Sequence, residues 1–248
     1  MSDGRHDHWA GWYDAVYAAH FGSFLDALTR RNTETILALA QDGETVIDYG
    51  AGTGRLSVPL LDAGRRVIAV DPSMGMLDQL RAKAGGHPNL RCLHGTIAEA
   101  RVEPPGQCDA AVCVFTVLAY LLEEVELSRS FNAMATALKP GGRLLLDIPG
   151  RGLFGNGGCD HGGIERHVDI VATDDEGRFE YRERTRIRDA QSTGAPATVD
   201  YVTKFPLRWW PRSTVEACWT RAGFALETDL SASYRDSGAE YVVLRRIR

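Results

Sequence analysis

Residues 45–143 constrain the fold of this chain more than any other segment. Short runs of apolar and β-branched residues alternate there with longer stretches whose apolar residues recur every three or four positions. The short runs predict buried strands, and the longer stretches predict helices with one apolar face on a sheet. Parallel strands need such crossover helices between them. The predicted parallel strands are 45–48, 66–70, 90–93, 110–115 and 143–148.

The remainder of the chain shows a different sequence pattern. A helix is predicted over residues 125–138, and the Lys-Pro-Gly-Gly segment 139–142 is expected to end it as a turn. The glycine-rich segment 150–163 is expected to be a mobile loop. Further on, alternating apolar residues and turn signals predict antiparallel strands, then a helix, then two closing strands. Their ranges are 168–172, 179–187, 199–205, 211–222, 224–227 and 241–244, with a turn at 192–196.

The predicted fold class is therefore α/β. We expect a Rossmann-like, doubly wound sheet that is mostly parallel, with an antiparallel last strand and an antiparallel β elaboration beside it.

A glycine loop follows the first predicted strand, in the sequence Val-Ile-Asp-Tyr-Gly-Ala-Gly-Thr-Gly of residues 46–54. Glycine allows a sharp turn and lets a ligand lie against bare main chain, and the next helix offers unpaired N–H groups. The glycines alternate, whereas the dinucleotide fingerprint is G-x-G-x-x-G. Asp48 beside the loop disfavours a phosphate and favours an ammonium group. Asp71, which ends the second strand, can accept the hydroxyls of a ribose. A nucleoside joined to an amino acid fits both acids.

These motifs resemble those of class I S-adenosylmethionine-dependent methyltransferases. The likeness covers about residues 40–150 and includes Asp-x-Gly-x-Gly-x-Gly at 48–54, Val-Asp-Pro-Ser-Met at 70–74, and the segments 109–115 and 138–146. The Tyr-Asp-x-x-Tyr segment 13–17 is similar to the start of small-molecule enzymes such as nucleotide-sugar N-methyltransferases, whose N-terminal helix closes over the cofactor. The resemblance implies that S-adenosylmethionine is bound by Tyr13, Tyr17, Asp48, Gly50, Ala51, Gly52, Asp71, Pro72, Ile97 and Phe115.

The resemblance also implies a domain plan. Residues 1–40 would form a helical cap over the cofactor, and residues 41–149 and 207–248 would form the cofactor-binding core. Residues 150–206 would form a β-rich insertion that builds the substrate pocket.

The activity implied by the resemblance is methyl transfer to an N or O atom of a small-molecule metabolite by direct in-line displacement. Two alternatives stay open: a cofactor-binding module or partner subunit without catalysis, and a nicotinamide-dependent oxidoreductase, which the glycine spacing disfavours. His161 is the candidate catalytic base, because histidine titrates near neutral pH. Its neighbours Asp160, Glu165 and His167 could also decorate a solvated loop, and we expect no metal.

Composition limits the partners. The 28 basic and 33 acidic side chains of the 248 residues give a net charge of −5 without a basic run, which disfavours nucleic acid as a partner. The longest nearly apolar stretch, 110–122, is too short for a membrane span, and no signal peptide is apparent. The five cysteines form no C-x-x-C pair. We expect a cytoplasmic protein with a small-molecule methyl acceptor and no membrane partner; a homodimer is left open.

Overall fold

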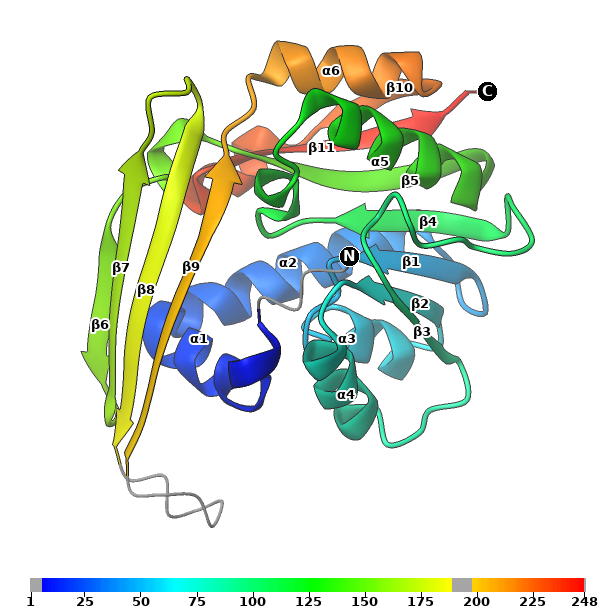
Figure 1. Ribbon diagram of the computed structural model, residues 1–248. Coiled ribbons are helices and arrows are strands. Elements are labelled where there is room, and N and C mark those ends of the chain that lie inside the picture. Colours follow the sequence, from blue (N-terminus) through cyan, green and yellow to red (C-terminus); the bar gives the residue numbers. More distant parts are fainter. Residues whose placement is uncertain (1–5, 189–197, 248) are drawn as a thin grey trace.

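The computed structural model describes residues 6–188 and 198–247, which form two β-sheets with helices around the larger one (Figure 1). The larger sheet contains β1 Thr45–Tyr49, β2 Arg66–Asp71, β3 Leu90–His94, β4 Cys108–Cys113, β5 Leu138–Pro149, β10 Phe224–Asp229 and β11 Ala239–Arg246. The smaller sheet contains β6 Gly157–His161, β7 Ile164–Ala172, β8 Arg178–Arg188 and β9 Thr198–Arg208. The α-helices are α1 Tyr13–Phe21, α2 Ser23–Leu39, α3 Ser57–Asp62, α4 Met74–Lys83, α5 Glu124–Ala137 and α6 Arg212–Arg221.

The larger sheet has the strand order β10-β11-β5-β4-β1-β2-β3. The pairs β1–β2, β1–β4, β2–β3 and β4–β5 are parallel, whereas β11 runs antiparallel to both β5 and β10. The strand order reverses beside β1, which is where ligands bind in open α/β sheets. The predicted fold class, including the antiparallel last strand, is confirmed.

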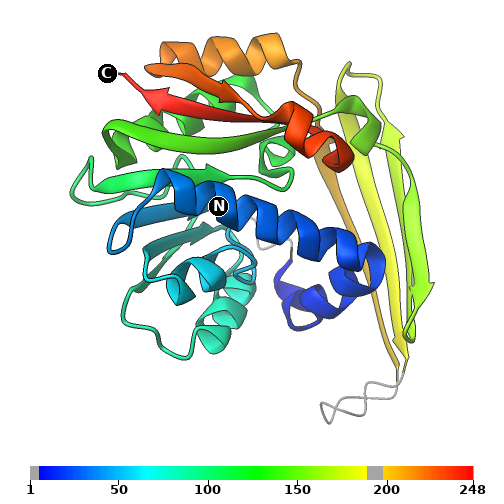
Figure 2. The ribbon, with the colours of Figure 1, turned by 180° about the vertical axis from the view of Figure 1, so that it is seen from behind.

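Side chains of β1 alternate between the two faces of the larger sheet, as a fully covered strand requires. Val46 joins a core built from α2, α3 and α4. Ile47 and Tyr49 join the core on the other face, which α5 and α6 cover. Figure 2, from behind, shows α2 lying across the sheet. The carboxyl ends of the parallel strands all lie at one edge of this sheet.

The smaller sheet is an antiparallel meander that stands beside those carboxyl ends, with α1 between the two sheets (Figure 1). One of its faces packs against the N-terminal segment, where Ile164, Ile187 and Tyr201 form a cluster with Trp9 and Val16. The predicted antiparallel elaboration is thus confirmed as a separate sheet, and it holds the first helix against the core.

A buried ion pair lies within this sheet. Arg166 of β7 and Glu183 of β8 are 4% and 1% exposed, and Arg166 Nε and Nη2 donate to the two Glu183 carboxylate oxygens at 2.9 and 3.0 Å. Glu183 also accepts hydrogen bonds from the hydroxyls of Tyr181, Thr185 and Tyr201. The guanidinium carbon of Arg166 lies 4.9 Å from the centre of the Tyr17 ring of α1. The pair therefore joins the second sheet to the first helix.

Three sequence-based expectations need correction. Within the predicted loop 150–163, residues 157–161 form β6; its ladder uses backbone groups alone, so the lack of an apolar pattern concealed it. Gly158 lies so close to β7 that a Cβ there would be 2.4 Å from the carbonyl oxygen of Arg166. The predicted turn 139–142 lies within β5, where the pairing with β4 shifts register. The strand predicted to reach Phe115 ends at Cys113, because Phe115 has a φ of 73°.

The predicted turn at 192–196 falls outside the described residues. Within residues 6–188 and 198–247, no helix combines the length and the apolar character needed to cross a membrane.

Removing Glu183 should be costly, because it leaves the Arg166 guanidinium buried without a counter-charge. We expect Glu183→Ala to lower the free energy of unfolding by about 3 to 5 kcal/mol. The matched control is Arg186→Ala on the exposed pair Arg186–Asp200, whose side chains are 51% and 59% exposed; it should cost less than about 1 kcal/mol. Urea denaturation measures both. Equal losses in the two variants would contradict a central role for the buried pair.

Candidate functional site

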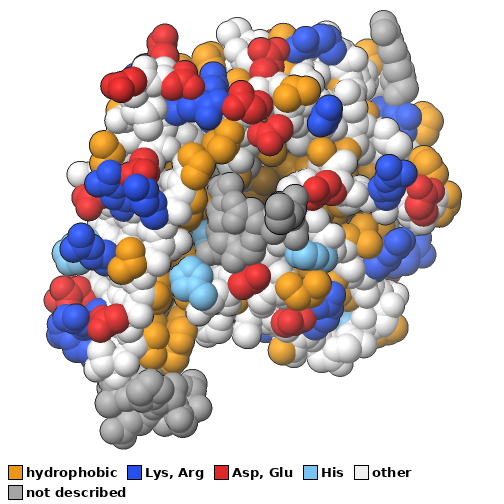
Figure 3. Space-filling view, in the orientation of Figure 1, with side chains coloured by type: hydrophobic (Ala, Val, Ile, Leu, Met, Phe, Trp, Pro, Cys, Tyr) orange, Lys and Arg blue, Asp and Glu red, His pale blue; other side chains and the backbone are white. Residues whose placement is uncertain are grey.

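A cavity of about 450 Å³ lies at the carboxyl ends of β1 and β2, beside the loop that follows β4. Its volume is typical of a small-molecule site. In Figure 3, hydrophobic side chains line a hollow near the centre of the visible face. Every residue predicted to contact the cofactor lines this one cavity: Tyr13, Tyr17, Asp48, Gly50, Ala51, Gly52, Asp71, Pro72, Ile97 and Phe115. The structure thus brings together residues from five separate segments of the chain, at 13–17, 48–52, 71–72, 97 and 115.

The three glycines of the loop after β1 differ in function. All three have positive φ angles, which glycine adopts without strain. A Cβ at Gly50 would lie 2.4 Å from Val117, and one at Gly54 would lie 2.4 Å from Leu80, so both positions need glycine for packing. A Cβ at Gly52 would have no neighbour within 4 Å. Gly52 therefore exposes bare backbone to the cavity, where a ligand can lie against it.

Asp71 ends β2 and is held by the loop that it faces. One carboxylate oxygen accepts a hydrogen bond from the Gly52 N–H at 2.8 Å, and the other accepts one from the Ser73 N–H at 2.8 Å. Burial raises the pKa of Asp71. Each oxygen keeps a second acceptor position, and together they can receive two hydroxyl groups of a ligand.

Asp48 also lines the cavity and is buried. Its Oδ2 accepts a hydrogen bond from the Ser57 hydroxyl at 2.7 Å. Burial raises the pKa of Asp48 to about 6. The carboxyl is therefore mostly ionised at pH 7 and would favour a cationic ligand group.

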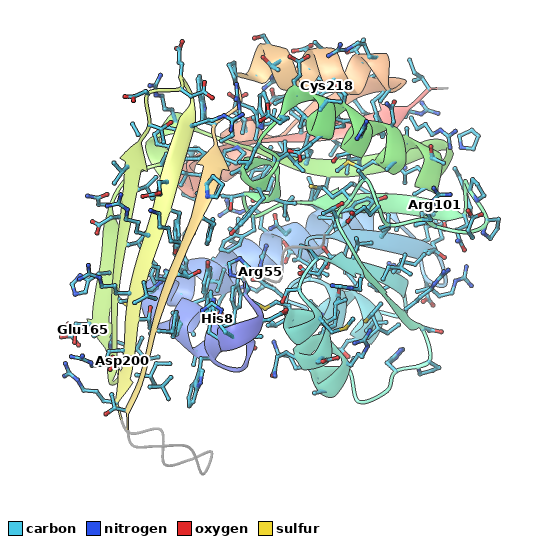
Figure 4. All side chains as sticks on the ribbon, in the orientation of Figure 1. His8, Arg55, Arg101, Glu165, Asp200 and Cys218 are labelled. Atoms are coloured by element: carbon cyan, nitrogen blue, oxygen red, sulfur yellow. The ribbon has the colours of Figure 1, made fainter. Side chains whose placement is uncertain are left out.

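Sequence reasoning missed Arg55. This residue follows the glycine loop directly, and its guanidinium lies 4.8 Å from the centre of the Phe115 ring. Its Nη1 donates to the Thr29 hydroxyl at 3.2 Å. Burial lowers the pKa of Arg55 but leaves the group charged. Figure 4 shows Arg55 in the interior, whereas Glu165 and Asp200 lie on the second sheet away from it. The sequence signal that could have identified Arg55 is its position as a cation immediately after the glycine loop.

The first helix supplies an aromatic wall. The rings of Tyr13 and Tyr17 stack with centres 4.1 Å apart, and Tyr17 lies 5.9 Å from Phe115. Burial raises the pKa of both tyrosines, so both hydroxyls stay protonated. Thr53 of the glycine loop donates to Asp14 at 2.6 Å. This hydrogen bond ties the first helix to the opposite side of the cavity.

A second cavity of about 340 Å³ adjoins the first one and extends toward the second sheet. His6, Tyr17, Phe115 and Tyr120 line both cavities, so the two meet at these side chains. The second cavity is lined by residues of α1, the end of β5, the segment after it, and β7, β8 and β9.

His161 does not reach either cavity. It ends β6, opposite Ile164 of β7, and its side chain is exposed. Neither cavity has His161 in its lining. The prediction of a catalytic base at this position relied on a mobile loop, and the strand that forms instead places His161 at the edge of the second sheet. Within residues 6–188 and 198–247, no group of three or more His, Cys, Asp or Glu side chains could hold a metal ion.

Comparison with known proteins identifies the central segment. Residues 46–142 match the family model described as a methyltransferase domain. An uncharacterized methyltransferase of Mycobacterium tuberculosis is 38% identical over 99 residues, which are 40% of this chain and 37% of that protein. The chain therefore matches less than half of the length of this relative. The resemblance expected from the motifs is confirmed for this domain.

Solved structures extend the likeness to nearly the whole chain. The CcbJ methyltransferase from Streptomyces caelestis is 21% identical and superposes with a TM-score of 0.80 over 100% of both chains. CalS10 from Micromonospora echinaspora, an amino pentose methyltransferase with bound S-adenosylmethionine, is 21% identical, with a TM-score of 0.71 over 94% of this chain and 96% of that chain. At these identities the superpositions establish a shared fold.

The backbone at Gly52 can be tested with a matched pair of substitutions. Gly52 and Gly85 have φ angles of 54° and 58°, and a Cβ at either one has no neighbour within 4 Å. Gly52→Ala and Gly85→Ala should each lower the free energy of unfolding by about 1 kcal/mol, because alanine is strained at these angles. Only Gly52→Ala should weaken S-adenosylmethionine binding, by at least about tenfold in calorimetry. Equal affinities of the two variants would show that the ligand does not approach Gly52.

The carboxyl of Asp147, at the end of β5, should make the stability of the protein depend on pH. Burial raises the pKa of Asp147 from 3.8 to about 6, so between these values the folded state binds more protons than the unfolded state. The free energy of unfolding therefore falls as the pH rises through this window. We expect the parent protein to lose about 1 kcal/mol relative to Asp147→Asn between about pH 5 and about pH 7. Urea denaturation at both pH values measures the difference, and parallel changes would contradict it.

Proposed function

We propose that this chain is an S-adenosylmethionine-dependent methyltransferase that transfers a methyl group to an N or O atom of a small-molecule metabolite. The observation that carries this proposal is that the ten residues which the resemblance implied all line one cavity, and that this cavity adjoins a second. The methyltransferase domain match at residues 46–142 supports it.

The residues of the first cavity fit the parts of S-adenosylmethionine. Asp71 would accept the ribose hydroxyls, and Pro72 and Ile97 would flank the adenine. The exposed backbone at Gly52 would lie against the methionine portion, with Gly50 and Ala51 beside it. When bound, S-adenosylmethionine supplies a methyl group on a positively charged sulfur, from which a nucleophile can take it directly.

Two oppositely charged side chains suit the amino-acid end of the same ligand. The half-buried guanidinium of Arg55 lines the first cavity, offers several N–H donors and would pair with the carboxylate. Asp48 would pair with the ammonium group. A dinucleotide would instead bring its pyrophosphate close to the buried carboxylate of Asp48 beside the glycine loop, which disfavours a nicotinamide cofactor.

The second cavity would hold the methyl acceptor. It meets the first cavity at Tyr17, Phe115 and Tyr120, and the methyl group would cross at this junction. Positioning two reactants in a closed site supplies much of the rate of a direct displacement. In this arrangement residues 1–40 act as a cap over the cofactor, residues 41–149 and 207–248 as the binding core, and residues 150–206 as the wall of the substrate pocket.

The environment of the cysteines supports a reducing compartment, such as the cytoplasm. All five are free thiols, and Cys108, Cys113 and Cys218 are buried. Reduced thiols are typical of cytosolic proteins.

The first test is calorimetric titration with S-adenosylmethionine and S-adenosylhomocysteine. The parent protein should bind both, and Asp71→Ala should weaken both by at least about tenfold, because the ribose loses its hydrogen-bond acceptors. Asp78→Ala removes an exposed carboxylate of α4 that pairs with Arg81, and it should leave both affinities unchanged.

Asp71→Ala would also weaken binding if it changed the conformation of the glycine loop, because Asp71 accepts a hydrogen bond from the Gly52 N–H. Asp71→Asn keeps a carbonyl acceptor and should retain more affinity than Asp71→Ala. A folded parent protein that binds neither ligand would overturn the proposal, and titration with NAD(H) would then test the oxidoreductase alternative.

A further inference from the structure

Asp147 is a buried carboxylate that the cofactor assignment leaves unused. It lies near the end of β5, one residue after the last pair with β4, is 2% exposed, and lines the second cavity. Its Oδ2 accepts hydrogen bonds from the backbone N–H groups of Phe115 and Thr116 at 2.9 and 3.0 Å. Its Oδ1 is buried and has no hydrogen-bond partner among the described residues. A buried carboxylate oxygen without a donor is costly, and a ligand that brings a donor would satisfy it.

The charges around Asp147 favour a cation as that donor. Arg166 also lines the second cavity, but Glu183 neutralises it through two hydrogen bonds. Arg55 lies close enough to lower the pKa of Asp147, and in the proposed function it pairs with the cofactor carboxylate. Burial lowers the pKa of His20, another residue of this cavity, so its imidazole is neutral near pH 7. Asp147 therefore remains without a full counter-charge once the first cavity is occupied.

Several aromatic rings line the second cavity, together with aliphatic side chains. Tyr181 and Phe205 stack with ring centres 4.5 Å apart, and Tyr120 lies 5.5 Å from Phe205. Phe154 contributes a further ring to the lining. The faces of such rings attract cations and pack against apolar groups. A ligand with an apolar body and one positively charged end suits this surface and the carboxylate beside it.

We propose that the methyl acceptor is an amine with an apolar or aromatic body, whose nitrogen is held by Asp147 in the second cavity. This inference rests on the proposed function and narrows it from N or O to N. The ammonium form binds to the ionised carboxylate and transfers one proton to Asp147 Oδ1. The nitrogen lone pair then forms a bond to the methyl carbon as the carbon–sulfur bond breaks, and the electron pair of that bond stays on sulfur. The carboxyl proton passes to solvent after the products leave.

The two carboxylate oxygens of Asp147 have different roles in this scheme. Oδ2 holds the backbone at Phe115 and Thr116, whose φ angles of 73° and 67° are unusual for residues other than glycine. This contact needs only an acceptor, which an asparagine carbonyl oxygen also provides. Oδ1 would bind the amine and take its proton, for which an ionised carboxylate is required. Asp147→Asn therefore separates the structural role from the chemical one.

Binding of matched ligands tests the inference without turnover. The protein would first be saturated with S-adenosylhomocysteine, at a pH at which Asp147 is ionised. Its affinity for benzylamine would then be compared with that for benzyl alcohol, and its affinity for phenethylamine with that for phenethyl alcohol. The amine of each pair should bind at least about tenfold more tightly, as expected for a charge-assisted contact in a buried site. Asp147→Asn should abolish this preference. Asp169→Asn, an exposed carboxylate of β7 outside both cavities, should keep it.

The outcomes distinguish this inference from the proposed function. If the protein binds S-adenosylhomocysteine but no amine binds better than its alcohol, the amine inference is overturned while the methyltransferase proposal stands. The same holds if the Asp147→Asn variant keeps the amine preference. If S-adenosylhomocysteine itself does not bind, the proposed function fails first. The parent protein should also transfer the methyl group of labelled S-adenosylmethionine to the preferred amine. In Asp147→Asn the rate of this transfer should fall at least about 100-fold, while the affinity for the cofactor stays unchanged.

Discussion

Three buried carboxylates at one edge of the larger sheet hold the loops that line both cavities. Asp48, Asp71 and Asp147 lie at the carboxyl ends of β1, β2 and β5, because parallel strands all end at the same edge. Each carboxylate accepts hydrogen bonds from a neighbouring loop or helix start: Ser57 for Asp48, Gly52 and Ser73 for Asp71, and Phe115 and Thr116 for Asp147. The loops around both cavities are therefore held by acids that also line these cavities.

The second sheet completes the site by closing it on one side. Without β6 to β9, the aromatic side chains of α1 would face solvent, since Ile164, Ile187 and Tyr201 cover them. The buried pair of Arg166 and Glu183 brings a charged group to the Tyr17 ring, which lines both cavities. Excluding water from such a site strengthens every electrostatic interaction within it. Stability and ligand chemistry thus depend on the same contact between a sheet and a helix.

The sequence predicted those elements correctly whose own residues carry a strong pattern. The strands that contain Ile47 and Ile68 were predictable, because residues buried on both faces give short apolar runs with few alternatives. Gly157–His161 was not predictable as a strand, because its ladder needs no side chains. Arg55 was missed for a different reason: an arginine just before a helix is usually exposed, and only the surrounding elements half-bury this one.

The sequence by itself determined the fold class and ten of the residues around the first cavity, although not Arg55. Alternating glycines and strand-end acids are local features, and the topology of a parallel sheet brings them to one edge whatever the rest of the chain does. Only the tertiary structure decided the second cavity, the exclusion of His161 and the unpartnered oxygen of Asp147. These depend on how a separate sheet packs across α1 and the carboxyl edge. Contacts between segments so distant in sequence leave no periodicity or motif in the segments themselves.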